Sequence, residues 1–401
     1  MDINAGRARQ ALATLESVER LEPDNPWLAL YRGLAHLQLG DPYLAMAQFD
    51  RGIEALAALG NPEPDLADTM RQYRRVARRQ VLTFSYRVGL GYDTNVSYLG
   101  SNVAIGPGLI TGRRDSEVTS RFELAYAPVA TATDTVTMGV RLDHAWYDKI
   151  HEFNYQDYGS TLRYARRLDD HWELSLRYDY DQILLDNQSF LSSHALSPAL
   201  EYHWRAAPRP IALDTTSVYY QYNRQHYPIR VDPLFNRDGD VHVLGVQQSF
   251  AFQPLPAAAR SGELTCGYRY VSYITKGTEF DEIARSVYVN VNVPVLNPIA
   301  PQQYLILPDK ELMFRFSFSW ELDGYRNISV LDRYGRQRRD TIRTYGFCLS
   351  QKLVQHPRYG DLTLHGMIDL TDADSNIATR DGGTPFTYDK VVYGAQLEWT
   401  W

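Results

Sequence analysis

Long apolar runs are missing from this sequence: no uninterrupted stretch approaches the roughly 20 residues that a membrane-spanning helix needs. Cysteine is scarce as well, since Cys266 and Cys348 are the only two and lie in no CxxC or Cys/His cluster. This excludes a disulfide-rich scaffold and a cysteine-based zinc site, and it leaves the redox compartment open. An excess of positive charge is also absent, because the net charge is −7, so we expect no nucleic-acid partner.

Sequence motifs of catalysis and metal binding are absent too. No HExxH, GxSxG or phosphate-binding loop occurs. The ten histidines are scattered, and sequence spacing gives neither His203 nor His365 a serine and a carboxylate partner. The segment with Asp372, Asp374 and Asn376 begins like a calcium-binding loop but lacks the glycine and the final glutamate that such a loop needs. We therefore expect no enzymatic activity, no cofactor and no metal ion.

Aromatic residues, in contrast, are abundant. The 401 residues include 29 tyrosines and 7 tryptophans. Both side chains favour places where one end is in apolar surroundings and the other is wet, and the surface of a membrane is such a place. A membrane protein without transmembrane helices therefore remains possible.

Residues 1–80 have the periodicity of α-helices. From Asn25 onward, apolar residues recur at spacings of three, four and eight, and Gly40-Asp41-Pro42 interrupts the pattern between two helices. This helical pair resembles a tetratricopeptide repeat, in which small residues allow the two helices to pack closely. The residues expected to form its core are Leu30, Gly33, Leu37, Ala45 and Phe49.

The segment upstream of this pair has the spacing of the second helix of another repeat, and its first helix is missing. A repeat that begins halfway lacks the partner for its apolar face. No basic and apolar signal-peptide regions follow Met1. We therefore expect further sequence upstream, including a signal peptide; the alternative is a short helical hairpin that is complete as it stands.

From Val81 onward the period of the pattern is two. In HWELSLRYDYD, for example, Trp172, Leu174 and Leu176 alternate with Glu173 and Arg177, as in a strand with one apolar face. Each such segment is long enough to cross a bilayer as a tilted strand. About fourteen segments have this pattern: 82–96, 116–128, 134–148, 156–167, 170–184, 194–205, 212–226, 240–253, 261–275, 283–294, 310–323, 341–354, 360–372 and 387–401.

The connections between these segments alternate in length. Short ones such as RLDD, after Arg166, interleave with long polar ones such as GSNVAIGPGLITGRRD, from Gly100. This alternation is typical of transmembrane β-barrels. A soluble β-sandwich is the alternative, but its strands are shorter, nearer 5 or 6 residues. The predicted fold is thus α+β and multidomain: a helical domain over residues 1–80 and an antiparallel transmembrane β-barrel of about 14 strands over residues 81–401.

The chain ends on VVYGAQLEWTW, which we interpret as the strand that closes the barrel against the first one. An alternating strand with a terminal aromatic resembles the C-terminal assembly signal of bacterial outer-membrane proteins, although Val392 stands where a polar residue is usual. The resemblance implies the outer membrane as location, outer-membrane lipid and the barrel assembly machinery as partners, and the periplasm for the helices. The residues that carry it are Gly394, Leu397, Trp399 and Trp401.

Helical repeats followed by a barrel whose first strand reads FSYRVGLGYDTNVSYLG resemble the surface lipoprotein assembly modulator family, through Gly91, Tyr92, Asp93, Asn95 and Val96. This resemblance implies translocation or display of lipoproteins at the cell surface, with a periplasmic lipoprotein client on the helical repeats. Exopolysaccharide export porins are similar in plan. An exopolysaccharide or small-solute export channel is therefore the alternative function, and a surface protein whose loops bind partners is a third.

Charged residues of both signs alternate with the apolar ones and are expected to face the lumen. A conduit for a polyanion would instead have an excess of arginine and lysine. Cross-strand ion pairs, Arg141 with Asp143 and Arg177 with Asp179, are one interpretation, and a substrate track is the other. The residues assigned to the lumen are Arg87, Asp93, Arg121, Glu123, Arg141, Asp143, Arg163, Arg177, Asp179, Arg269, Arg315, Glu321, Lys352 and Asp369.

Two further predictions concern single segments. By the same alternation, Cys266 faces lipid and Cys348 faces the lumen, so the two should not form a disulfide. The arginine-rich segment 71–80, which precedes the first strand, is either a solvated helix face or a contact with lipid phosphates at the inner rim.

Overall fold

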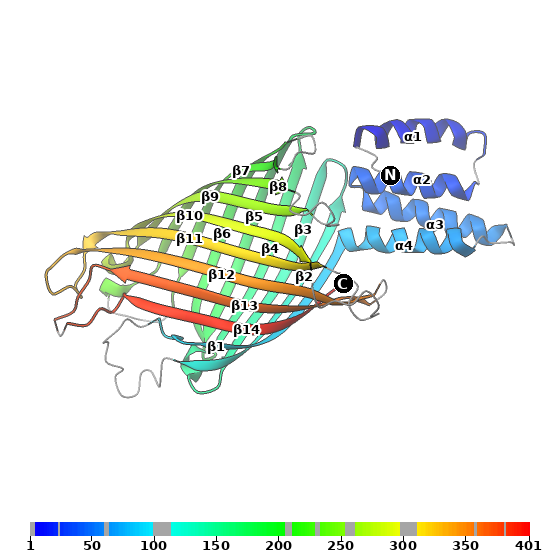
Figure 1. Ribbon diagram of the computed structural model, residues 1–401. Helices are drawn as coiled ribbons and strands as arrows, with labels where there is room; N and C mark the ends of the chain where they lie inside the picture. The colour runs from blue at the N-terminus through cyan, green and yellow to red at the C-terminus, as the bar shows by residue number, and fades with distance from the viewer. Residues whose placement is uncertain are drawn as a thin grey trace.

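The structure, a computed structural model, describes residues 5–22, 25–59, 64–98, 114–204, 211–228, 233–252, 261–296, 311–356, 359–380 and 382–401. Within these residues, four helices stand at one end of a closed antiparallel barrel of fourteen strands (Figure 1). The C-terminus lies at the same end as the helices (Figure 1). The predicted fold class is confirmed.

The helices begin and end where the sequence has capping residues. The side chain of Asn25 accepts a hydrogen bond from the Trp27 N–H, which caps the second helix. Gly40 ends that helix in the left-handed conformation, with φ of 84°, so the predicted break is confirmed. Among the described helices, none is long and apolar enough to cross a membrane. The helices are α1 (Ala5–Glu19), α2 (Pro26–Leu39), α3 (Pro42–Ala58) and α4 (Pro64–Val81).

The core of the helical part lies between α2, α3 and α4. Leu30, Ala45 and Phe49 are buried there together with Met70 of α4, and Leu37 packs against them partly buried. The Phe49 ring leaves no room for a side chain on Gly33 of α2, since a Cβ on Gly33 would lie 2.3 Å from that ring. This close approach is the packing expected of a repeat pair, and membership in the tetratricopeptide family stays a prediction.

Each strand pairs with its two neighbours in the chain, and β1 pairs with β14 to close the barrel. Among the described residues, the strands are β1 (Leu82–Asp93), β2 (Asp115–Ala130), β3 (Asp134–Tyr147), β4 (Tyr155–Arg167), β5 (Trp172–Leu185), β6 (Gln188–His203), β7 (Ile211–His226), β8 (Gly239–Phe252), β9 (Gly262–Thr275), β10 (Glu282–Leu296), β11 (Glu311–Ile328), β12 (Gln337–His356), β13 (Gly360–Ser375) and β14 (Tyr388–Thr400).

The outer face of the barrel is apolar. Val140, Leu244 and Ile368 are 46%, 54% and 47% exposed, although a soluble protein would bury most side chains of this kind. Tyrosines and tryptophans such as Tyr164 and Trp172 are exposed among them. A closed barrel with an outward apolar surface is what a bilayer can cover, since every strand edge is paired and no backbone group needs water.

The terminal strand is held by the first one, as the aromatic chain end predicts. The Trp401 N–H donates to the Phe84 carbonyl, and the Phe84 N–H donates to the Trp401 carbonyl. The Trp399 ring lies edge-on against the Phe84 ring at 5.0 Å, and its indole N–H donates to the Tyr359 carbonyl at 2.6 Å. Hydrogen bonds and aromatic packing thus fix both tryptophans at the end of the barrel that adjoins the helices.

Strand ends and connections differ in places from the predictions. β6 begins at Gln188 rather than at residue 194, because Asp186 and Asn187 form a tight two-residue turn with φ of 47° and 61°. That turn lies at the end far from the helices, where long loops were predicted, so the alternation of short and long connections is not regular. Most of the long connection from Gly100, residues 100–113, lies outside the described residues.

Candidate functional site in the barrel lumen

The inner face of the barrel is polar and charged. Along β3, for example, Gly139, Arg141 and Asp143 point inward and alternate with the exposed apolar Val140 and Leu142. The register of the strands places the charged residues assigned to the lumen from sequence on this inner face, on nine of the strands within the described residues. They do not form one cluster. They lie in several groups along the length of the barrel.

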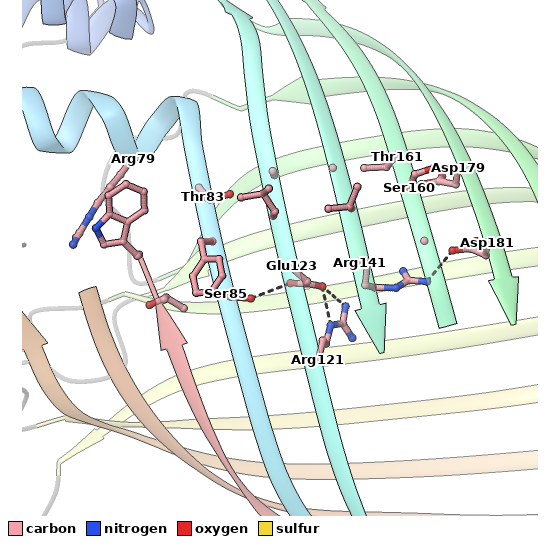
Figure 2. A pocket seen from close by; sticks show the side chains of 18 of the residues that line it. Arg79, Thr83, Ser85, Arg121, Glu123, Arg141, Ser160, Thr161, Asp179 and Asp181 are labelled. Atoms are coloured by element: carbon pink, nitrogen blue, oxygen red, sulfur yellow. Dashed lines mark hydrogen bonds and ion pairs between the residues drawn. The ribbon is translucent and has the colours of Figure 1, made fainter. Parts of the chain in front are cut away.

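The largest group lines a cavity of about 580 Å³ at the end of the lumen next to the helices (Figure 2). The inner faces of β1 to β5 form its wall, and Arg79 of α4 and Trp401 lie at its rim. Its wall also includes the small polar Thr161, which shares the inner face of β4 with Gly159 (Figure 2). The cavity therefore opens the lumen towards the helical part of the chain.

Arg141 is the centre of the charge network in this cavity. Its guanidinium group lies 3.0 Å from Asp143, 2.5 Å from Asp157 and 2.9 Å from Asp181, so it joins three neighbouring strands. Arg121 on β2 extends the network, since it lies 3.5 Å from Asp143 and also pairs with Glu123. Carboxylates lie next to both arginines, so the wall of the cavity is polar and its positive and negative charges nearly balance.

The predicted cross-strand pairs are wrong in detail. Arg141 pairs with Asp143, and Arg177 with Asp179 at 2.8 Å, but the partners of each pair lie two residues apart on one strand. Residues i and i+2 of a strand share a face, and a long arginine side chain spans the distance between them. The cross-strand partners of Arg141 are instead Asp157 and Asp181, which sequence alone could not identify because the register was unknown.

Most of the remaining lumenal charges form ion pairs along the rest of the barrel. Lys390 and Asp93 form a buried pair, 2.8 Å apart, near the end far from the helices. Arg315 donates to Asn292 at 3.1 Å, and Asp369 lies opposite Gly346 and Val392. The other pairs are Arg87 with Glu398, Arg163 with Glu173, Arg269 with Glu321, and Lys352 with Asp361, at 2.7, 2.9, 3.1 and 3.0 Å.

The residues of the predicted assembly signal lie along the seam between β14 and β1. Gly394 is directly opposite Gly91, and Leu397 is opposite Val88 with both side chains exposed on the outer face. A Cβ on Gly394 would lie 2.4 Å from the Leu90 carbonyl oxygen. Their recognition by assembly machinery stays a prediction.

The helical part is docked on the barrel. α4 ends at Val81 and β1 begins at Leu82, so no linker separates them. In addition, Asp41 accepts a hydrogen bond of 2.5 Å from the Ala132 N–H in the β2–β3 turn, and the Tyr43 hydroxyl donates to the Ala127 carbonyl at 2.7 Å. Burial and the hydrogen bond with Tyr126 raise the pKa of Tyr43 to about 12, so this hydroxyl keeps its proton at neutral pH.

The arginine-rich segment divides into two groups. Arg71 pairs with Asp68 at 2.6 Å, and Arg74 pairs with Asp50 at 2.6 Å, both within the helical part. Arg78, in contrast, lies over the Trp401 ring at 4.9 Å. The helix thus presents its last turn to the rim of the barrel, and contact of this turn with lipid phosphates stays a prediction.

Both cysteines are free. Cys266 shares the outer face of β9 with Leu264 and Tyr268 and lies opposite Val289 of β10. Cys348, in contrast, faces the lumen, where its sulfur lies 3.5 Å from the Ser350 hydroxyl. The predicted absence of a bond between them is therefore confirmed.

One group of lumenal residues escaped the sequence analysis. His365 on β13 lies between Ser350 on β12 and Glu398 on β14, within hydrogen-bonding distance of both. His203 has no comparable pair: its Nδ1 lies 3.2 Å from the Thr215 hydroxyl, and its Nε2 lies 4.0 Å from Glu201. No sequence signal could have joined three residues on three strands, because only the register brings them together.

Comparison with known proteins gives distant likenesses. No protein-family model matches the chain. No curated protein matches it either. Among solved structures, a bacterial polysaccharide outer membrane secretin is 10% identical with a TM-score of 0.38, covering 79% of this chain and 98% of its own. An anion-selective porin from Comamonas acidovorans is 7% identical with a TM-score of 0.38, covering 80% and 98%.

CdiB from Acinetobacter baumannii is also similar, at 8% identity and a TM-score of 0.35, covering 79% of this chain and 60% of CdiB. At such identities the likeness concerns the fold alone. The chain's own geometry therefore has to support its function.

Proposed function

We propose that this chain is an outer-membrane transport protein that translocates or displays surface lipoproteins, with its helices in the periplasm. The observation that supports this most is the docking of the helical part at the barrel rim, through the α4–β1 junction and the bonds made by Asp41 and Tyr43. Helical repeats bind protein segments on extended surfaces. A client held there lies next to the cavity at the lumen mouth.

The seam between β1 and β14 supports release of a client with a lipid anchor. Gly89, Gly91 and Gly394 lie on the inner face at this seam, where the two strands approach each other without side chains of these residues between them. Two ion pairs cross the seam within the described residues, Arg87 with Glu398 and Asp93 with Lys390. β1 and β14 pair over nine residues, against twelve between β1 and β2 and thirteen between β13 and β14. This shorter seam can open at lower cost than its neighbours, which would let an acyl chain reach the bilayer sideways.

Surface display of a lipoprotein co-expressed with the full chain tests this function. We expect display, measured by protease shaving of intact cells, to fall several-fold when Asp41→Ala and Tyr43→Phe are combined, because the helices then lose two hydrogen bonds to the barrel. Tyr31→Phe, which removes an exposed tyrosine hydroxyl on the neighbouring helix α2, is the matched control and should leave display unchanged. Unchanged display by the double variant would argue against presentation through docked helices.

A further inference from the structure

Three side chains on adjacent strands form a hydrogen-bonded relay in the lumen. The Ser350 hydroxyl lies 2.8 Å from His365 Nδ1, and His365 Nε2 lies 3.0 Å from Glu398 Oε2. A carboxylate only accepts hydrogen bonds, so Nε2 carries the imidazole proton and Nδ1 is the acceptor for the serine hydroxyl. The Cys348 thiol also lies within hydrogen-bonding distance of His365. Arg87 holds the second carboxylate oxygen of Glu398 at 2.7 Å, which fixes the orientation of the acid.

The surroundings suit a reactive group. His365 and Glu398 have side-chain exposures of 15% and 16%, so the relay is largely shielded from water. Ser350 itself remains partly exposed to the lumen. A nucleophile, a base within hydrogen-bonding reach and a third group that orients the base are the arrangement that activates serine in hydrolases.

We propose that Ser350, His365 and Glu398 form a hydrolytic site for carboxylic esters small enough to enter the lumen. Ser350 Oγ attacks the ester carbonyl carbon while its proton moves to His365 Nδ1. The carbon–oxygen bond to the alcohol then breaks, and His365 returns the proton to the leaving alcohol. Water, deprotonated by the same nitrogen, releases the acid from the acyl-serine and restores the hydroxyl. Glu398 is a positioning residue, because it acts through the imidazole.

The charge that develops on the carbonyl oxygen requires a donor from a side chain, since the backbone N–H groups of the strands are engaged in the sheet. Arg315 is the candidate. It lies directly opposite Cys348, two residues from Ser350 on the same face of β12, and only its Nε is bonded to Asn292 in the described structure. This site does not depend on the transport function proposed above, and either can fail without the other.

Labelling with a biotinylated fluorophosphonate, which forms an adduct with activated serines, tests the proposal on the purified, folded full chain. We expect one adduct, located by mass spectrometry on the peptide with Ser350, and none in Ser350→Ala. His365→Ala should label about 100-fold more slowly or worse, as expected for loss of a general base. Glu398→Gln should slow labelling less and shift its pH midpoint to lower pH, which a purely structural role would not do.

Two controls separate chemistry from folding. Each variant is first shown to migrate as a heat-modifiable barrel on gels, and Ser319→Ala, at another lumenal serine, should label like the original chain. No adduct on Ser350, an equal adduct on other lumenal serines, or labelling that is unaffected by His365→Ala would overturn the proposal.

Discussion

At the scale of single residues, Gly33 decides how closely α2 and α3 approach. Phe49 is fully buried, so its ring cannot move away from a new methyl group at Gly33. We expect Gly33→Ala to destabilise the helical part by about 1–3 kcal/mol, the usual cost of overpacking, despite the better helix propensity of alanine. Denaturant unfolding measures this, and adding Phe49→Leu should restore part of the loss. A Gly33→Ala variant as stable as the original would show that the two helices can move apart freely.

The stability of the docked helices depends on pH through His36. Burial lowers the pKa of His36, and the nearby Asp41 only partly opposes this. The folded state therefore favours the neutral imidazole. The contribution of His36 to the free energy of unfolding is complete above the ordinary histidine pKa of about 6.5, and it is lost as the pH falls towards the lower pKa that His36 has in the folded protein. We expect trypsin resistance of the helical part to fall between pH 7.5 and 5.5. His36→Asn, which does not titrate, should flatten this dependence, and an equal slope in both chains would contradict the assignment.

At the scale of elements, the seam between β1 and β14 is expected to open during transport. Phe84 and Trp401 exchange both backbone hydrogen bonds, so the next pair, Ser85 and Thr400, is a close non-hydrogen-bonded pair with a spacing suited to a disulfide. In a chain with Cys266→Ser and Cys348→Ser, we expect oxidised Ser85→Cys/Thr400→Cys to block lipoprotein display and a reductant to restore it.

The matched control for this lock is a disulfide at a different strand pair. Asn290→Cys/Ser317→Cys joins two residues that are opposite each other on the inner faces of β10 and β11, away from the seam. It should leave display intact when oxidised. Undiminished display by the locked seam, with the disulfide verified by mass spectrometry, would show that the client does not leave between β1 and β14.

The strands of the barrel could be predicted from the sequence, whereas some strand ends and the contacts between strands could not. Alternation identified the strands because one face meets lipid and the other meets polar groups, as at Trp172 and Glu173. It missed the start of β6, where the strand continues beyond its apolar stripe to the turn at Asp186 and Asn187. The lumenal relay was out of reach, because Ser350 and Glu398 meet only through the register of the strands.

At the scale of the whole molecule, the paired charges predict a lumen that conducts poorly. Ion pairs such as Arg141 with Asp157 and Arg269 with Glu321 hold the side chains of the inner face in place. A barrel of this strand number lies between filled eight-strand barrels and open 16- to 18-strand pores. We expect the full chain in planar bilayers to give only small, intermittent currents. A large, steady conductance proportional to salt would favour the solute-channel alternative.

Passage of a protein client through the lumen mouth can be tested most directly by site-specific photocrosslinking in cells that co-express a lipoprotein. A photoreactive residue replaces either Thr161, which lines the cavity, or its neighbour Leu162, which is exposed on the outer face. We expect the lipoprotein to crosslink at position 161 and not at 162, and we expect the combination of Asp41→Ala with Tyr43→Phe to weaken this crosslink. Active display without any crosslink at 161, or with equal crosslinks at both positions, would contradict it.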